Sequence, residues 1–273
     1  METARLGLHE APRRTRHLAP DGAPSVTHRV ALHADGDRGN RVIRVLQTDP
    51  GVEIGRLRTG PDPEGTPGSV AGWDVLAVDA LTAACLPLVE EACDLGLPVV
   101  VAADLPARFA AAPDATIVGG AGSGAGLAAA LALSMLPRSA EPVKARLAWT
   151  VAGRPLRAGR AVTFPEPVGS LWAGWGENPL PWPDVACCPA PTDSAWKAVR
   201  VDLEFRDAEG GGSVVHGVSD EARFLDAACF GSAILAAARG AYPRGAGGPG
   251  DPDGVFVRLA QDAGMQVARF VAA

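Results

Sequence analysis

The sequence predicts an α/β protein with a doubly wound parallel sheet of the Rossmann type, followed by a second domain of the α+β class. Short apolar segments alternate with helical segments between residues 28 and 136, and the connections between them are short. After residue 140, several strand-like segments follow one another before two helical segments appear. With 273 residues, 47% of them hydrophobic, the chain can build both cores.

The segments of the first domain end at recognisable residues. Their apolar stretches have the composition of buried parallel strands. Pro50-Gly51 ends the first helical segment, Gly96 ends the second, and Pro137 ends the third. The expected strands are 28–34, 52–58, 72–79, 97–104 and 115–120, and the expected helices are 39–49, 80–96, 126–136 and a short one near 105–112.

The second domain is expected to open with a hairpin around Gly153-Arg154. We divide the chain into a disordered tail (1–26), a Rossmann-like dinucleotide-binding domain (27–140) and an α+β domain for substrate binding or dimerisation (141–273). The expected strands of this last part are 145–153, 155–164, 185–190, 196–205, 213–218 and 265–271, and the expected helices are 220–239 and 253–263.

Composition and charge exclude several classes of protein. The net charge of -6, without a basic stripe, gives no basis for binding nucleic acid. The longest apolar stretch, 125–136, is shorter than the ~20 residues that span a membrane, and no apolar signal segment opens the chain. The five cysteines form no CxxC pair, so we expect a reduced, cytoplasmic protein without a metal site.

The loop between the first strand and the first helix carries part of the dinucleotide fingerprint G-x-G-x-x-G. Residues 34–39 read ADGDRG, so the second and third glycines are present and alanine replaces the first. The loop leaves a strand and opens a helix, as pyrophosphate binding requires. Its two acidic residues put negative charge there, which the neighbouring arginines Arg38 and Arg41 could offset in part. A cofactor loop and a plain strand-to-helix turn both fit this pattern. The expected cofactor-binding residues of the loop are Gly36, Asp37, Arg38 and Gly39.

The end of the second strand indicates which dinucleotide would bind. An acidic residue there favours NAD, whereas an arginine favours the additional phosphate of NADP. Arg56 and Arg58 stand at this position, so NADP is the expected cofactor and NAD is the alternative. Arginines on a solvated loop would give the same pattern. Asp79 joins the expected site because it follows the third strand at the same edge of the sheet.

Asp104 and His216 are the candidates for chemistry. Asp104 follows the fourth strand, where it could hold a substrate amine or orient a water, or could cap a helix. His216 could donate a proton, or could be a hydrogen-bonded structural residue within a strand. Lys144 and Lys197 are interpreted as surface lysines.

The glycine-rich segment GGAGSGAG (119–126) favours an ordered turn close to a ligand, because an apolar strand and helix flank it tightly. Its serine, Ser123, invites comparison with the hydrolase motif G-x-S-x-G. Alanine stands at both outer positions where glycine is required, so we discount a serine hydrolase.

Three stretches resemble the saccharopine dehydrogenase-like oxidoreductases, within the wider group of two-domain NAD(P)-binding dehydrogenases. They are the loop at 34–39, the strand–helix–strand segment 73–104, and the strand, glycine-rich turn and helix at 117–133. The segment 153–169 is similar to the start of that family's second domain. The resemblance implies an NAD(P)-dependent oxidoreductase that acts on a small polar metabolite such as an amino or imino acid.

Two functional hypotheses therefore stay open. The first is an NADP-dependent oxidoreductase with a small-molecule substrate. The second is a non-catalytic descendant of the same fold that serves as a binding or assembly subunit. The incomplete loop and the lack of a clear proton donor favour the second, whereas the ordered sheet and the arginines favour the first. A homodimer through the second domain is compatible with both.

Overall fold

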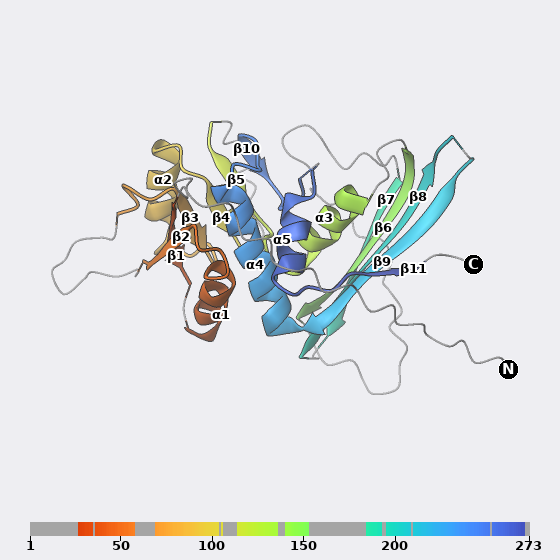
Figure 1. The fold of residues 1–273 in the computed structure, drawn as a ribbon, viewed down its shortest axis with the longest axis horizontal. Helices are drawn as coiled ribbons and strands as arrows, with labels where there is room; N and C mark the ends of the chain where they lie inside the picture. The colour runs from red at the N-terminus through yellow and green to blue at the C-terminus, as the bar shows by residue number, and fades with distance from the viewer. Residues whose placement is uncertain are drawn as a thin grey trace, which may run out of the picture.

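We analysed a computed structural model of the chain. The structure describes residues 27–34, 36–57, 69–103, 105, 114–135, 140–152, 184–192, 195–208, 210–251 and 253–270. Two sheets with helices between them make up this part of the chain (Figure 1).

The first sheet is parallel and forms one layer of the molecule. Its central strands are fully buried, because helices cover both faces and every side chain must be apolar. The six described strands lie in the order β10 (Gly245–Gly247), β5 (Thr116–Val118), β4 (Val99–Val101), β3 (Val75–Val78), β1 (His28–His33) and β2 (Val52–Arg56).

Helices lie on both faces of this sheet, as in a doubly wound fold. Helix α2 (Leu86–Asp94) covers one face, and α1 (Gly36–Leu46) and α4 (Ala222–Ala238) cover the other (Figure 1). Helix α4 is alanine-rich and almost entirely buried, because it lies between the parallel sheet and the second half of the molecule. The α/β class and the Rossmann-like sheet predicted from the sequence are confirmed.

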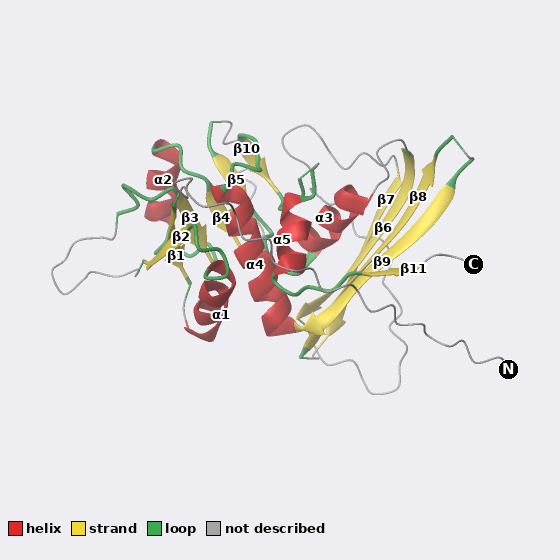
Figure 2. Ribbon diagram, viewed as in Figure 1, coloured by secondary structure: helices red, strands yellow, loops and turns green. Residues whose placement is uncertain are grey.

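The second sheet is mixed and lies on the other side of the helical layer (Figure 2). Strands β6 (Glu141–Ala152) and β7 (Asp184–Thr192) run parallel, and the remaining pairs are antiparallel. Helices α3 (Ala125–Met135) and α5 (Val255–Asp262) pack between the two sheets. The described strands lie in the order β11 (Ala268–Phe270), β9 (Gly212–Glu221), β8 (Trp196–Arg206), β6 (Glu141–Ala152) and β7 (Asp184–Thr192).

One strand was not expected from the sequence. β10 pairs in parallel with β5, so the chain returns to the first sheet after it has built most of the second. Its residues, Gly245–Gly247, carry no apolar run that would predict a strand. The division of the chain into domains at residue 140 stays a prediction.

Some expected elements lie outside the described residues. They are the tail 1–26, the short helix near 105–112 apart from residue 105, and the hairpin strand 155–164. Within the described part, no helix is both long and apolar enough to span a membrane.

Helices α1 and α4 approach closely at Gly231. A Cβ atom at this position would lie 2.6 Å from Cγ1 of Val45 on α1, which is too close for two carbon atoms. The valine is β-branched and cannot easily turn away. The glycine therefore fixes how closely the last turn of α1 is held to α4, and both helices contribute side chains to the site described below.

We predict that Gly231→Ala lowers the free energy of unfolding by about 1–2 kcal/mol, because overpacking outweighs the helix propensity that alanine gains. Adding Val45→Ala should restore part of the loss, since it removes the atoms that clash. Urea unfolding of the two single variants and the double variant measures this coupling. Additive effects of the two substitutions would contradict the close approach.

Candidate functional site

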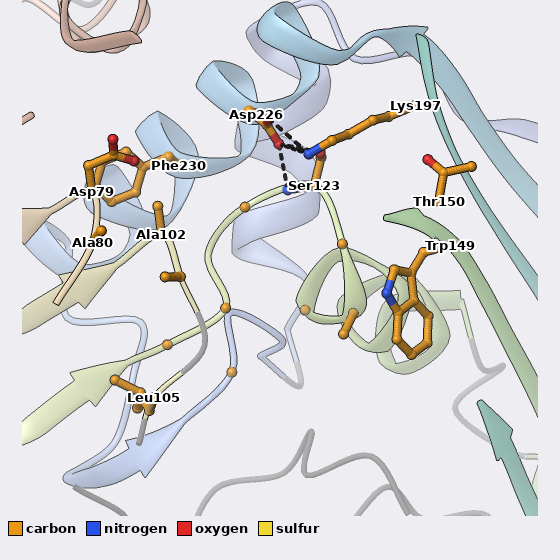
Figure 3. Close-up of a pocket in the computed structure, with 18 of the residues that line it drawn as sticks. Asp79, Ala80, Ala102, Leu105, Ser123, Trp149, Thr150, Lys197, Asp226 and Phe230 are labelled. Carbon is orange, nitrogen blue, oxygen red and sulfur yellow. Dashed lines mark hydrogen bonds and ion pairs between the residues drawn. The ribbon is translucent and has the colours of Figure 1, made fainter. Parts of the chain in front are cut away.

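A cavity of about 750 Å³ opens at the carboxyl ends of the parallel strands. This edge is where ligands bind in open α/β sheets. The segments that follow β3, β4, β5 and β10 line one side of the cavity, and β6 and β8 of the second sheet line the other. Much of the wall is glycine backbone from the turn at 119–126, with Trp149, Leu105 and Phe230 as its large apolar side chains (Figure 3).

The loop before α1 has the geometry that the fingerprint glycines provide. Gly36 has φ +61°, a left-handed conformation, and a Cβ atom there would meet nothing within 4 Å. At Gly39 a Cβ atom would lie 2.5 Å from the carbonyl oxygen of Ala34, so only glycine lets the helix start so close to the strand. The helix begins at Gly36 rather than at residue 39 as expected, because the left-handed glycine turns the chain directly into it.

Arg38 projects from the first turn of α1 into the cavity. Its Nη1 donates a hydrogen bond to the carboxylate of Asp79, which follows β3. Its Nη2 lies 3.8 Å from Oδ2 of Asp226 on α4. Burial lowers the pKa of Arg38, but the hydrogen bond from Arg38 to Asp79 and the charges of Asp79 and Asp226 outweigh it, so the pKa lies above its ordinary value. The structure thus brings together two residues that the sequence assigned to the cofactor site, Arg38 and Asp79, and adds a second acid, Asp226.

Asp226 is the most heavily bonded group of the cavity. Lys197 on β8 reaches both of its carboxylate oxygens, with Nζ 2.8 Å from Oδ1 and 2.9 Å from Oδ2. The backbone N–H of Ser123 donates to Oδ1 at 3.3 Å, and the serine hydroxyl donates to the same atom. Figure 3 shows that the ends of Lys197 and Ser123 lie close together beside the carboxylate of Asp226.

The environment of Asp226 favours its ionised form. Burial raises the pKa of this carboxyl, since its side chain is only 15% exposed. The hydrogen bonds from Lys197 and Ser123 and the lysine charge outweigh burial, so the pKa lies below its ordinary value of 3.8. The group is therefore an acceptor and an anchor for Lys197.

The remaining cofactor candidates lie away from this cluster. The Asp37 side chain is 61% exposed and pairs with Arg41 at 3.0 Å, so its charge is turned toward solvent. Arg56, at the end of β2, donates to Oδ1 of Asn40 on α1. Arg58 falls outside the described residues.

The two candidates for chemistry do not meet in the described cavity. Asp104 lies outside the described residues. His216 is buried within β9, and it is absent from the described residues that line the cavity. Burial, with Arg269 as a second cause, lowers the pKa of His216, and its Nδ1 has no hydrogen-bond partner among the described residues.

Sequence reasoning missed the polar centre of the cavity. Lys197 was interpreted as a surface lysine, but only 22% of its side chain is exposed, and it faces the interior between Ala-rich helices and the sheet. The alternation of side chains along β8 could have predicted this, because it places Lys197 on the same face of the strand as the buried Val199. Asp226 stands alone in an apolar helix, and a lone acid in such a helix indicates a buried partner.

Metal binding has no support within the described part of the chain, where no group of at least three His, Cys, Asp or Glu residues could hold an ion.

Comparison with known proteins extends the fold assignment. No family model and no curated protein matches the sequence. Among solved structures, the fold is similar to apo saccharopine dehydrogenase (L-Glu forming) from Saccharomyces cerevisiae, with a TM-score of 0.61 and 8% identity over 90% of this chain and 100% of that one. It is also similar to homospermidine synthase from Legionella pneumophila in complex with NAD, with a TM-score of 0.52 and 10% identity over 90% of this chain and 91% of that one. The chain therefore has a saccharopine dehydrogenase-like fold, as the resemblance implied.

We predict that Asp226→Asn lowers the free energy of unfolding by about 1–3 kcal/mol at pH 7, because it leaves the half-buried Lys197 ammonium without its counter-ion. Asp226 has a folded pKa below its unfolded value, so it stabilises the fold above about pH 3.8 and this stabilisation is lost as the pH falls through the folded pKa. The unfolding curves of the variant and the parent should converge below that pH.

Urea unfolding across this pH range measures the effect. Asp202→Asn is a suitable control, because Asp202 pairs with Arg200 on the solvent side of the same strand as Lys197. We expect the control to change the free energy of unfolding by less than about 1 kcal/mol. An Asp226→Asn effect no larger than that of the control would contradict the anchoring role.

Proposed function

We propose that this protein is an NADP-dependent oxidoreductase that acts on a small polar metabolite, and that the metabolite is an amino or imino acid. The observation that supports the proposal most is the pair of glycines, Gly36 and Gly39, at the start of α1. Gly36 has open space where a side chain would stand, and Gly39 lets the helix approach β1. Arg38, which lies between them in sequence, lines the large cavity at the carboxyl edge of the Rossmann-like sheet.

The residues of this edge fit a nicotinamide dinucleotide. The free N–H groups and the positive end of the dipole at the start of α1 suit a diphosphate, and the missing side chain of Gly36 leaves room for its approach. Arg38 lies in the same turn and could exchange its carboxylate partners for phosphate oxygens. Asp79, which directly follows β3, accepts a hydrogen bond from Arg38. A bound nicotinamide would supply the hydride chemistry that no side chain can.

NADP is the cofactor we favour over NAD. Arg56 ends β2, which is the strand whose end contacts the adenosine ribose in this fold. Its guanidinium already donates to Asn40 on α1, so it is held at the side of the sheet where a 2′-phosphate would lie. Arg58 would add a second positive charge.

The charges of the cavity suit a substrate that carries both signs. Two cations, Arg38 and Lys197, and two anions, Asp79 and Asp226, line it together. A zwitterionic amino acid or an iminium acid matches such a balanced set better than a purely anionic or cationic molecule does. A cytoplasmic location and a homodimer through the second sheet accompany this proposal as predictions.

The competing function is that of a non-catalytic binding or assembly subunit. The observation in its favour is that Arg38 is already bonded by Asp79 and faces Asp226. Loss of cofactor binding in the intact protein would favour this second function.

We predict that the protein binds NADPH with saturable enhancement of nicotinamide fluorescence, and that Gly36→Asp abolishes it. Aspartate tolerates a left-handed φ and suits a helix start, so the variant should fold. Its carboxylate would repel the diphosphate, which should raise the Kd at least about tenfold more than a neutral side chain does. Gly36→Asn is the matched control, since it has the same shape without the charge. Equal binding by the two variants would count against a diphosphate at α1.

We further predict that Arg56→Ala weakens NADPH binding about tenfold and leaves NADH binding unchanged, because it removes a charge-assisted hydrogen bond to the 2′-phosphate. Arg56→Lys should keep part of the preference. Competition titrations of both nucleotides measure it. Parallel weakening of NADPH and NADH would show that Arg56 acts on the loop and not on the phosphate.

A further inference from the structure

We propose that the end of the cavity next to the second sheet binds a carboxylate group of the substrate. The carboxylate would lie between the first turn of α3, the indole N–H of Trp149 and the ammonium of Lys197. This inference rests on the proposed function, because it names which group of the small polar substrate is held and where. It can nevertheless be tested without any nucleotide.

Trp149 provides the first observation. It lies on β6, only 8% of its surface is exposed, and it lines the cavity. Its indole N–H donates to no other residue in the part of the chain that the structure describes. A Cβ atom at Gly124 would lie 4.0 Å from this nitrogen, so the N–H edge lies beside the glycine-rich turn (Figure 3). Because Trp149 lines the cavity, its N–H is available to donate to an acceptor atom of a ligand.

The start of α3 provides the second observation. The first N–H groups of an α-helix have no partner within the helix, and Gly124, Ala125 and Gly126 at this end all line the cavity. Only small residues stand here, so the backbone donors are not screened by side chains. The helix is 11 residues long, and its dipole favours negative charge at this point. Trp149 and the helix start therefore present donors to the same space.

Lys197 provides the third donor. An ammonium group has three N–H bonds, and Asp226 accepts from this one at 2.8 and 2.9 Å. At least one N–H is left for a ligand. Asp226 itself also accepts from Ser123, so its oxygens are largely occupied. Asp226 thus holds Lys197 in position and leaves the remaining N–H of the lysine for a ligand.

Local charge selects the kind of anion. Asp226 lies within hydrogen-bond distance of Lys197, so any anion bound to the lysine feels its repulsion as well. A carboxylate carries a single charge, whereas phosphate carries about 1.5–2 charges at neutral pH and would be repelled up to twice as strongly. The lysine and the helix start can compensate one negative charge more readily than two. The site therefore suits a carboxylic acid, such as the acid group of an amino or imino acid.

The test uses the full-length protein labelled with ¹⁵N-tryptophan and two small probes that differ only in the acid group. Glycine carries the carboxylate, and glycinamide keeps the amine without it. We expect glycine to shift the indole N–H resonance of Trp149 in a saturable way, and glycinamide to shift it little. Trp149→Phe identifies the resonance. Equal shifts with glycinamide, a larger shift with inorganic phosphate, or no shift with glycine would each overturn the proposal.

Ligand-observed NMR then measures how glycine binding depends on each donor. Trp149→Phe keeps an aromatic wall and removes the N–H, so the Kd for glycine should rise about tenfold. Lys197→Met should raise it by at least as much. Trp196→Phe is the control, since Trp196 is 56% exposed and belongs to the same sheet. Thermal unfolding of each variant confirms that it is folded. A control effect equal to that of Trp149→Phe would overturn the assignment.

The outcome is separable from that of the proposed function. NADPH binding without a glycine response would remove the carboxylate site and leave the oxidoreductase proposal standing. A glycine response without NADPH binding would keep the carboxylate site and favour a non-catalytic binding protein.

Discussion

The carboxylate of Asp226 is the group on which the arrangement of the cavity depends. It stands on α4, yet it bonds Ser123 at the start of α3 and Lys197 on β8, and it lies near Arg38 on α1. A single charge thus connects the turn after β5, the second sheet and the first helix. Taking an acid into a helix as apolar as α4 is costly, and the several hydrogen bonds to it offset that cost.

This connection also explains why the cavity stays open. Lys197 and Arg38 are long side chains that could fold across the space, but each is drawn to a carboxylate at the wall. The glycine-rich turn contributes backbone and little else, so it adds donors without adding bulk. The large side chains, Trp149 and Phe230, are buried and bound the cavity at its sides (Figure 3).

The fold was largely predictable because its signals are local. Short valine-rich apolar runs such as Val75–Val78 and Val99–Val101 are typical of buried strands, and the alternation with helices predicts a parallel sheet. The site was predictable from the sequence only for residues that stand next to the ends of predicted strands and helices. Gly36, Arg38 and Asp79 end or begin elements at one known edge, but Lys197 and Asp226 meet through the packing of α4 on β8, 29 residues apart in sequence. No local pattern reports such a contact.

The late strand β10 has a consequence for how the protein is made. Strand β5 ends up between β4 and β10, but β10 is synthesised after nearly all of the second sheet. While the ribosome is still adding the intervening chain, the outer side of β5 presents unpaired backbone groups, which are a template for joining other polypeptides. The nascent chain thus carries an open edge until Gly245–Gly247 have been synthesised, and chaperones that shield such edges would have their greatest effect during that interval.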